Sequence, residues 1–122
     1  MSMPETHMDP VNAAGRFLLE LVAAYGIGAG IRHATGSWIL TVAVVAVALV
    51  VWGRFRVPDD PGPAPRPVSG AVRLAIEAVI LGGGVAGVWA VHGPTPGAVF
   101  LAVLVAHYAT TPRRLRHVRS FR

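Results

Sequence analysis

The sequence contains no cysteine and no lysine, and only 14% of its residues are charged. The absence of cysteine excludes disulfides, thiolate metal ligands and cysteine nucleophiles. Aromatic residues make up only 7%, and they do not alternate with basic residues as they do on nucleic-acid-binding surfaces. Every basic side chain that contributes to the net charge of +5 is arginine, and the arginines gather in loops and near residue 122. We therefore expect membrane anchoring and no nucleic-acid partner.

What the chain has in abundance is apolar residues, at 53% of its 122 positions. That content is too high for a soluble domain of this length, so a bilayer is the expected solvent. Four apolar segments predict transmembrane helices, at about 13–31, 38–55, 70–91 and 96–111. The second and fourth are marginal in length, because a spanning helix needs roughly 17 to 20 residues.

The remaining segments are polar or rich in proline. Residues 1–12 carry no signal-peptide pattern and are expected to form a disordered cytoplasmic lead. Residues 58–68 form a proline-rich loop, and residues 112–122 a basic tail that can contact anionic lipid headgroups. Only Arg32 falls on the side opposite the other arginines, which places both termini and the middle loop in the cytoplasm. Abundant alanine, valine, glycine and arginine without lysine suggest a GC-rich bacterial genome, hence a bacterial cytoplasmic (inner) membrane.

An internal repeat appears when the sequence is shifted by 57 positions. The shift aligns arginine with arginine, glutamate with glutamate and glycine with glycine: Arg16 with Arg73, Glu20 with Glu77, Gly26 with Gly83, Gly30 with Gly87. The predicted fold is therefore an all-α membrane four-helix bundle of two tandem helical hairpins, 13–57 and 69–111. Each hairpin crosses twice, so the repeat is parallel, with a pseudo-two-fold axis along the membrane normal. The first and third helices should meet at this axis through their GxxxG glycines.

Glu20 and Glu77 are the candidate catalytic residues, because ionisable groups within transmembrane segments are costly and are often functional. In one interpretation each glutamate pairs with the arginine four residues earlier, Arg16 or Arg73, and only holds the bundle in register. In the other, the pseudo-symmetry brings the two carboxylates together near the axis as an acid and a base. Helical periodicity places Gly84 on the same face as Glu77.

Five further residues near the same membrane side are candidate binding residues: Arg16, Arg73, Trp52, His107 and Tyr108. His107 could carry a proton near neutral pH or serve only as an interfacial polar residue. We interpret Trp52 and Tyr108 first as residues of an aromatic belt at the membrane interface, and second as walls of a pocket. No HExxH or Glu-x-x-His motif is present, so we expect no metal and no cofactor.

Several motifs resemble one family. The segment RFLLEL, the exit VWGRFRVPDDP, the segment RLAIEAVILGG and the HY near the end of the final helix are similar to the YrdB family of small bacterial membrane proteins, also called DUF2568. The resemblance covers roughly Val11 to His117. The family is functionally uncharacterised, so the resemblance implies an architecture and assigns no role to any residue.

Three functions fit these observations. The first is a non-enzymatic protein that binds or passes a small apolar or amphipathic molecule in a cytoplasmic-leaflet pocket between the first and third helices, or acts as an accessory subunit. The second is a membrane-embedded isomerase, cyclase or hydrolase that uses Glu20 and Glu77 as acid and base. The third is a proton-coupled transporter, which would have to form a homodimer to build a pathway.

Overall fold

The computed structural model describes residues 10–56 and 64–121, and within them the chain is almost entirely helical. The elements are α1 (Pro10–Thr35), α2 (Trp38–Arg54), β1 (Phe55–Arg56), β2 (Arg66–Pro67), α3 (Gly70–His92), α4 (Pro94–Ala109) and α5 (Pro112–Arg119). The two short strands pair in parallel and join the end of α2 to the start of α3. Most of the expected lead and the expected proline-rich loop lie outside the described residues. The last residues of the expected lead are helical, because α1 begins at Pro10.

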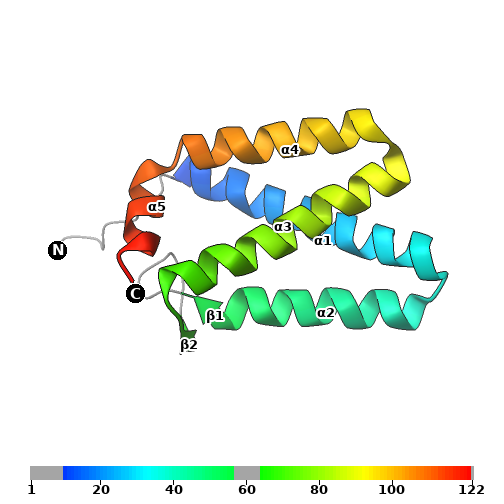
Figure 1. Ribbon diagram of the computed structural model, residues 1–122, viewed down its shortest axis with the longest axis horizontal. Helices are drawn as coiled ribbons and strands as arrows, with labels where there is room; N and C mark the ends of the chain where they lie inside the picture. Colours follow the sequence, from blue (N-terminus) through cyan, green and yellow to red (C-terminus); the bar gives the residue numbers. More distant parts are fainter. Residues whose placement is uncertain (1–9, 57–63, 122) are drawn as a thin grey trace.

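The four long helices run alternately in opposite directions, with α2 and α4 on opposite sides of a central pair formed by α1 and α3 (Figure 1). Tight turns join the two helices of each hairpin. Gly36, at φ 69°, precedes α2, where the Ser37 hydroxyl caps the backbone N–H of Leu40. Gly93, at φ 96°, precedes α4, which starts at Pro94, two residues earlier than predicted. Proline is tolerated there because the first N–H of a helix has no intrahelical partner.

The contact between α1 and α3 is so close that only glycine fits at several positions. A Cβ atom added to Gly30 would lie 2.9 Å from the Cα of Gly87, and one added to Gly26 or Gly84 would overlap the backbone of the opposite helix. Gly83, which the repeat places in this contact, would meet only a side chain at 3.5 Å. The predicted pairing of Gly83 is therefore wrong by one residue, and Gly84 lies at the crossing.

Large apolar side chains face outward along α1, α2, α3 and α4, among them Phe17, Ile39, Val79 and Val105. The buried apolar core is small by comparison and lies between the helices, around Leu81. By length and composition, α1 and α3 could each cross a membrane, and α2 and α4 are shorter apolar helices.

The predicted basic tail forms the helix α5, which lies across the end of the molecule where α1 and α3 begin (Figure 1). It is held there by the backbone: the N–H of Gly70 donates to the carbonyl of Phe121 at 2.5 Å. Arg114 and Val118, one turn apart on α5, are buried on the side of this helix that faces the rest of the molecule. Its outer surface carries three exposed arginines, which we call the basic face of α5: Arg113, Arg116 and Arg119.

Candidate functional site

A buried carboxylate, that of Glu77, lies at the centre of the polar residues. Glu77 lies in the second turn of α3, and only 1% of its surface is exposed to solvent. Oε1 accepts hydrogen bonds from Arg16 Nη2 at 2.8 Å and Arg114 Nη1 at 3.0 Å. Oε2 accepts from Arg73 Nε at 2.9 Å and Arg114 Nη2 at 2.6 Å. The Tyr108 hydroxyl donates to Oε1 as well. We call these five residues the Glu77 cluster.

Arg73 connects this cluster to the end of α2. It is 1% exposed, and its Nη1 donates to the carbonyls of Trp52 at 2.7 Å and Phe55 at 3.1 Å. The last carbonyls of a helix lack intrahelical partners and carry partial negative charge, so a guanidinium is a suitable donor to them. The guanidinium also lies 4.4 Å from the centre of the Trp52 ring. Arg73 thereby ties the second hairpin to the first.

Arg16 contacts both candidate carboxylates. Its Nε donates to Glu20 Oε1 at 3.2 Å, while its Nη2 donates to Glu77. The guanidinium also lies about 5 Å from the ring centres of Trp52 and Tyr108. The intrahelical Arg–Glu pairing that the sequence suggests is therefore present in both α1 and α3, but Glu77 gains two further arginines.

The two glutamates do not share a cavity. Glu20 lines a cavity of about 140 Å³ between α1 and α2, to which Ile80 and Leu81 of α3 also contribute. Glu77 lines one of about 510 Å³ between α3 and α4. The glycine crossing brings the backbones of α1 and α3 into contact, and Arg16 lies between the carboxylates. The cavities that the described residues form around Glu20 and Glu77 are thus separate, and a catalytic role for either glutamate stays a prediction. The pocket expected between the first and third helices stays a prediction, since Ile80 and Leu81 of α3 contribute to the cavity that Glu20 of α1 lines.

The larger cavity, which we call the α3–α4 groove, is apolar along most of its length. Only two polar side chains, Glu77 and Tyr108, contribute to its lining. The other lining residues are apolar or glycine: Leu74, Ala78, Leu81, Gly82, Val85, Leu101, Leu104 and Val105. Since Glu77 and Tyr108 belong to neighbouring turns at the α5 end of the two helices, the groove has one polar end.

The remaining predicted binding residues are buried beside the Glu77 cluster. Trp52 is buried and is one of the residues that line the α1–α2 cavity. His107 is buried next to Tyr108, with ring centres 5.9 Å apart. Among the described residues, its Nε2 has no hydrogen-bond partner. It does not line the α3–α4 groove.

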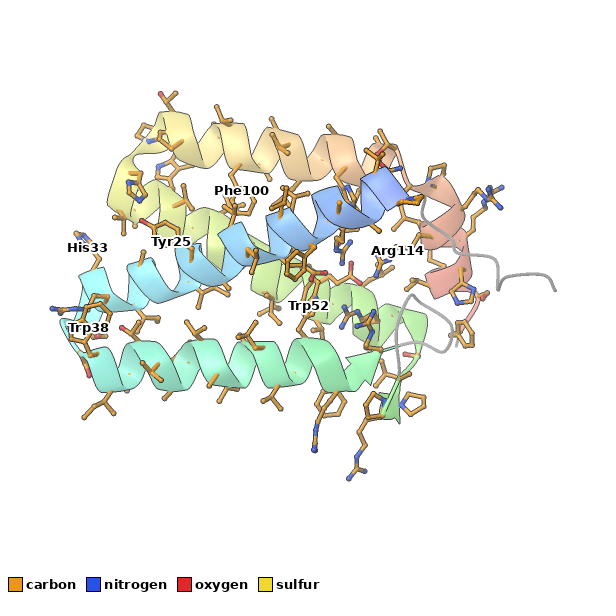
Figure 2. The ribbon with its side chains drawn as sticks, turned by 180° about the vertical axis from the view of Figure 1, so that it is seen from behind. Tyr25, His33, Trp38, Trp52, Phe100 and Arg114 are labelled. Atoms are coloured by element: carbon orange, nitrogen blue, oxygen red, sulfur yellow. The ribbon has the colours of Figure 1, made fainter. Side chains whose placement is uncertain are left out.

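Sequence reasoning missed Arg114, which it assigned to the basic tail. Figure 2 shows this side chain on α5, at the opposite end of the molecule from Trp38. The signal was present in part: Pro112 suits the first position of a helix, and Arg114 and Val118 are spaced to share one face. Within residues 10–56 and 64–121, no three histidine or acidic side chains gather as a metal site.

A second polar contact lies at the end of the molecule far from α5. The Tyr25 hydroxyl and His92 Nε2 are 2.6 Å apart, joining α1 to α3, and Arg32 lies 4.8 Å from the centre of the Trp38 ring. Figure 2 shows Tyr25 and Trp38 in this half of the molecule.

Together these features define a small helical protein whose two hairpins are joined by a glycine crossing and a buried arginine–glutamate cluster. The family described as "Protein of unknown function (DUF2568)" matches residues 14–105, and the chain belongs to this family, as its motifs predicted. It is 30% identical over 115 residues to "Uncharacterized protein YrdB" of Bacillus subtilis (strain 168), which covers 89% of this chain and 94% of that protein. No solved structure matches significantly. Tyr108 and Arg114 lie beyond the segment matched by the family.

Proposed function

We propose that this protein spans the bacterial cytoplasmic membrane four times and binds a single-chain apolar or amphipathic molecule in the α3–α4 groove. The outward-facing apolar side chains on α1–α4 suit a lipid environment and would be unfavourable in water. At 1.5 Å per residue, the 17 residues of α2 and the 16 of α4 reach about 25 Å, slightly less than an average hydrocarbon core. Local thinning of the bilayer would accommodate such a mismatch at modest cost.

The distribution of arginine supports an orientation with α5 in the cytoplasm. Arg54, Arg66 and the basic face of α5 are exposed at the end where α1 and α3 begin. Among the described residues, the opposite end carries Arg32 and no other arginine. Cytoplasmic segments of membrane proteins are enriched in arginine and lysine, so the α5 end is the one we place inside the cell.

The shape and lining of the α3–α4 groove carry the proposal of a ligand. Its volume of about 510 Å³ falls within the range of roughly 300–1,000 Å³ that is usual for small-molecule sites. From Leu74 to Val85 it follows α3 for about 16 Å, at 1.5 Å per residue. The part of the groove from Glu77 to Val85, about 12 Å, would hold a single extended chain whose small head lies at Glu77 and Tyr108.

The first hairpin offers a comparison that supports this choice of groove. Residues 57 positions apart line the two cavities: Phe17 and Leu74, Glu20 and Glu77, Ala48 and Val105. In the first hairpin the larger Phe17 and the ring of Trp52 line the space, and only about 140 Å³ remains. The repeat would thus give two related grooves, of which the second is the roomier.

Filling the groove tests the proposal. A Cβ atom added to Gly82 meets no atom within 4 Å, so Gly82→Leu would occupy the groove without disturbing the helices. Gly15→Leu is the matched control, because Gly15 also has open space within a helix but lies outside the groove. We expect mass spectrometry of small molecules that co-purify with the protein to show a ligand with wild type and Gly15→Leu that Gly82→Leu loses. The same molecules in all three preparations would count against the groove.

A further inference from the structure

The polar end of the α3–α4 groove offers acceptors and no free donor. Glu77 accepts five hydrogen bonds, which use the approximately four lone-pair directions of a carboxylate. The Tyr108 hydroxyl donates its hydrogen bond to Glu77, and its oxygen keeps a lone pair that can accept one. None of the three arginines of the cluster lines the groove. The atom at this end that is best placed to bond a ligand is therefore the Tyr108 oxygen, as an acceptor.

Charge at this end disfavours both kinds of ionic head. A carboxylate or phosphate head would meet the Glu77 carboxylate as its nearest charge, because the arginines that make the cluster positive donate to Glu77 and do not line the groove. A cationic head would approach the Glu77 cluster, in which three arginines, Arg16, Arg73 and Arg114, outnumber the one glutamate. Burial strengthens both repulsions, since Glu77 and Arg73 are 1% exposed.

From this arrangement we infer that the molecule bound in the α3–α4 groove is a single-chain alcohol, whose uncharged hydroxyl donates to the Tyr108 oxygen and whose chain follows α3 from Glu77 toward Val85. The inference rests on the proposed function and adds the chemistry of the head. About 12 Å of the chain would lie in the groove, the distance along α3 from Glu77 to Val85 at 1.5 Å per residue.

Four probes with the same tetradecyl chain separate the alternatives: tetradecanol, tetradecane, tetradecanoic acid and tetradecylamine. The full-length protein is held on beads in detergent, and each probe competes with tritiated tetradecane in a scintillation proximity assay. We expect tetradecanol to bind about fivefold more tightly than the alkane, the effect of one neutral hydrogen bond. The acid and the amine should bind less tightly than the alcohol.

The outcomes distinguish the head from the groove. The inference of an alcohol head would be overturned if the acid or the amine bound most tightly, or if all four probes bound equally. Either result would still support a groove that binds a single chain. No saturable binding of any probe, which would mean only bulk lipid at this surface, would overturn the proposed function as well.

Tyr108→Phe tests the acceptor itself. The variant should lose the advantage of tetradecanol over tetradecane and should keep its affinity for tetradecane, which reports an intact groove. Tyr25→Phe removes a tyrosine hydroxyl that bonds His92 at the other end of the molecule, so it should keep the wild-type ratio. An unchanged preference for the alcohol in Tyr108→Phe would contradict the assignment.

Discussion

Arg16 joins the two glutamates that the internal repeat aligns, with its Nε 3.2 Å from Glu20 and its Nη2 2.8 Å from Glu77. The two carboxylates are equivalent in sequence but not in their surroundings. The side chain of Glu20 is 29% exposed and pairs with Arg16, whereas that of Glu77 is 2% exposed and faces three arginines. The two halves of the chain therefore differ in the surroundings of the glutamates that the sequence shift aligns.

This asymmetry predicts unequal losses of stability. Glu77→Gln would leave buried guanidiniums without their counter-charge, which typically costs about 3–5 kcal/mol. Glu20→Gln removes a partly exposed ion pair and should cost about 1 kcal/mol or less. Denaturant unfolding in detergent, followed by tryptophan fluorescence, measures both variants. Losses of similar size in the two variants would show that the burial of Glu77 does not increase the contribution of its ion pairs to stability.

The glycine crossing can be tested by adding one methyl group at a time. Gly87→Ala would place its Cβ against the backbone of Gly26, and we expect overpacking to cost about 1–3 kcal/mol. Gly83→Ala meets only an Ile27 side chain at 3.5 Å, and Gly82→Ala meets nothing. These two controls should be neutral or more stable by up to about 1 kcal/mol, because alanine favours helix. Thermal unfolding of the three variants separates them, and destabilisation by Gly83→Ala would restore the originally predicted crossing.

The proposed orientation can be tested directly, since the chain has no cysteine of its own. Single cysteines at the exposed positions Ala34 and Thr95 should react with a membrane-impermeant maleimide added outside intact cells. Ser120→Cys, at the α5 end, should react only after the cells are opened. The reverse pattern would invert the orientation, and reaction of all three in intact cells would contradict a spanning bundle.

The basic face of α5 should bind anionic headgroups. We expect replacement of Arg113, Arg116 and Arg119 by glutamine to weaken the preference for phosphatidylglycerol over phosphatidylcholine, at about 1 kcal/mol per arginine. Electron paramagnetic resonance of spin-labelled lipids measures that preference, which should also fall with salt. Arg32→Gln, at the other end, is the control. An unchanged lipid preference in the triple variant would show that the basic face of α5 does not bind the headgroups.

Much of this arrangement could be predicted from composition and spacing alone. Long apolar segments between glycine and proline turns identify the helices, and the i, i+4 spacing identifies the Arg16–Glu20 and Arg73–Glu77 pairs. Such signals are local. They depend on the backbone geometry of one helix and on the solvent around it, both of which can be inferred from a sequence.

The missed features depend on how helices pack. The difference between Gly83 and Gly84 at the crossing is a rotation of 100° about one helix, which is set by the facing surface of α1. Arg114 reaches Glu77 from 37 residues further along the chain, and no local pattern specifies that partner. Contacts of this kind require the three-dimensional arrangement.

The pairing of Arg114 with Glu77 also imposes an order of events during biosynthesis. All four long helices precede α5 in the chain, so they are synthesised while Glu77 has only Arg16 and Arg73 as cationic partners. The bidentate contact with Arg114 can form only after α5 has left the ribosome. Docking of α5 therefore follows the synthesis of the four long helices, and a bundle whose α5 is undocked would leave the buried carboxylate of Glu77 without its bidentate partner.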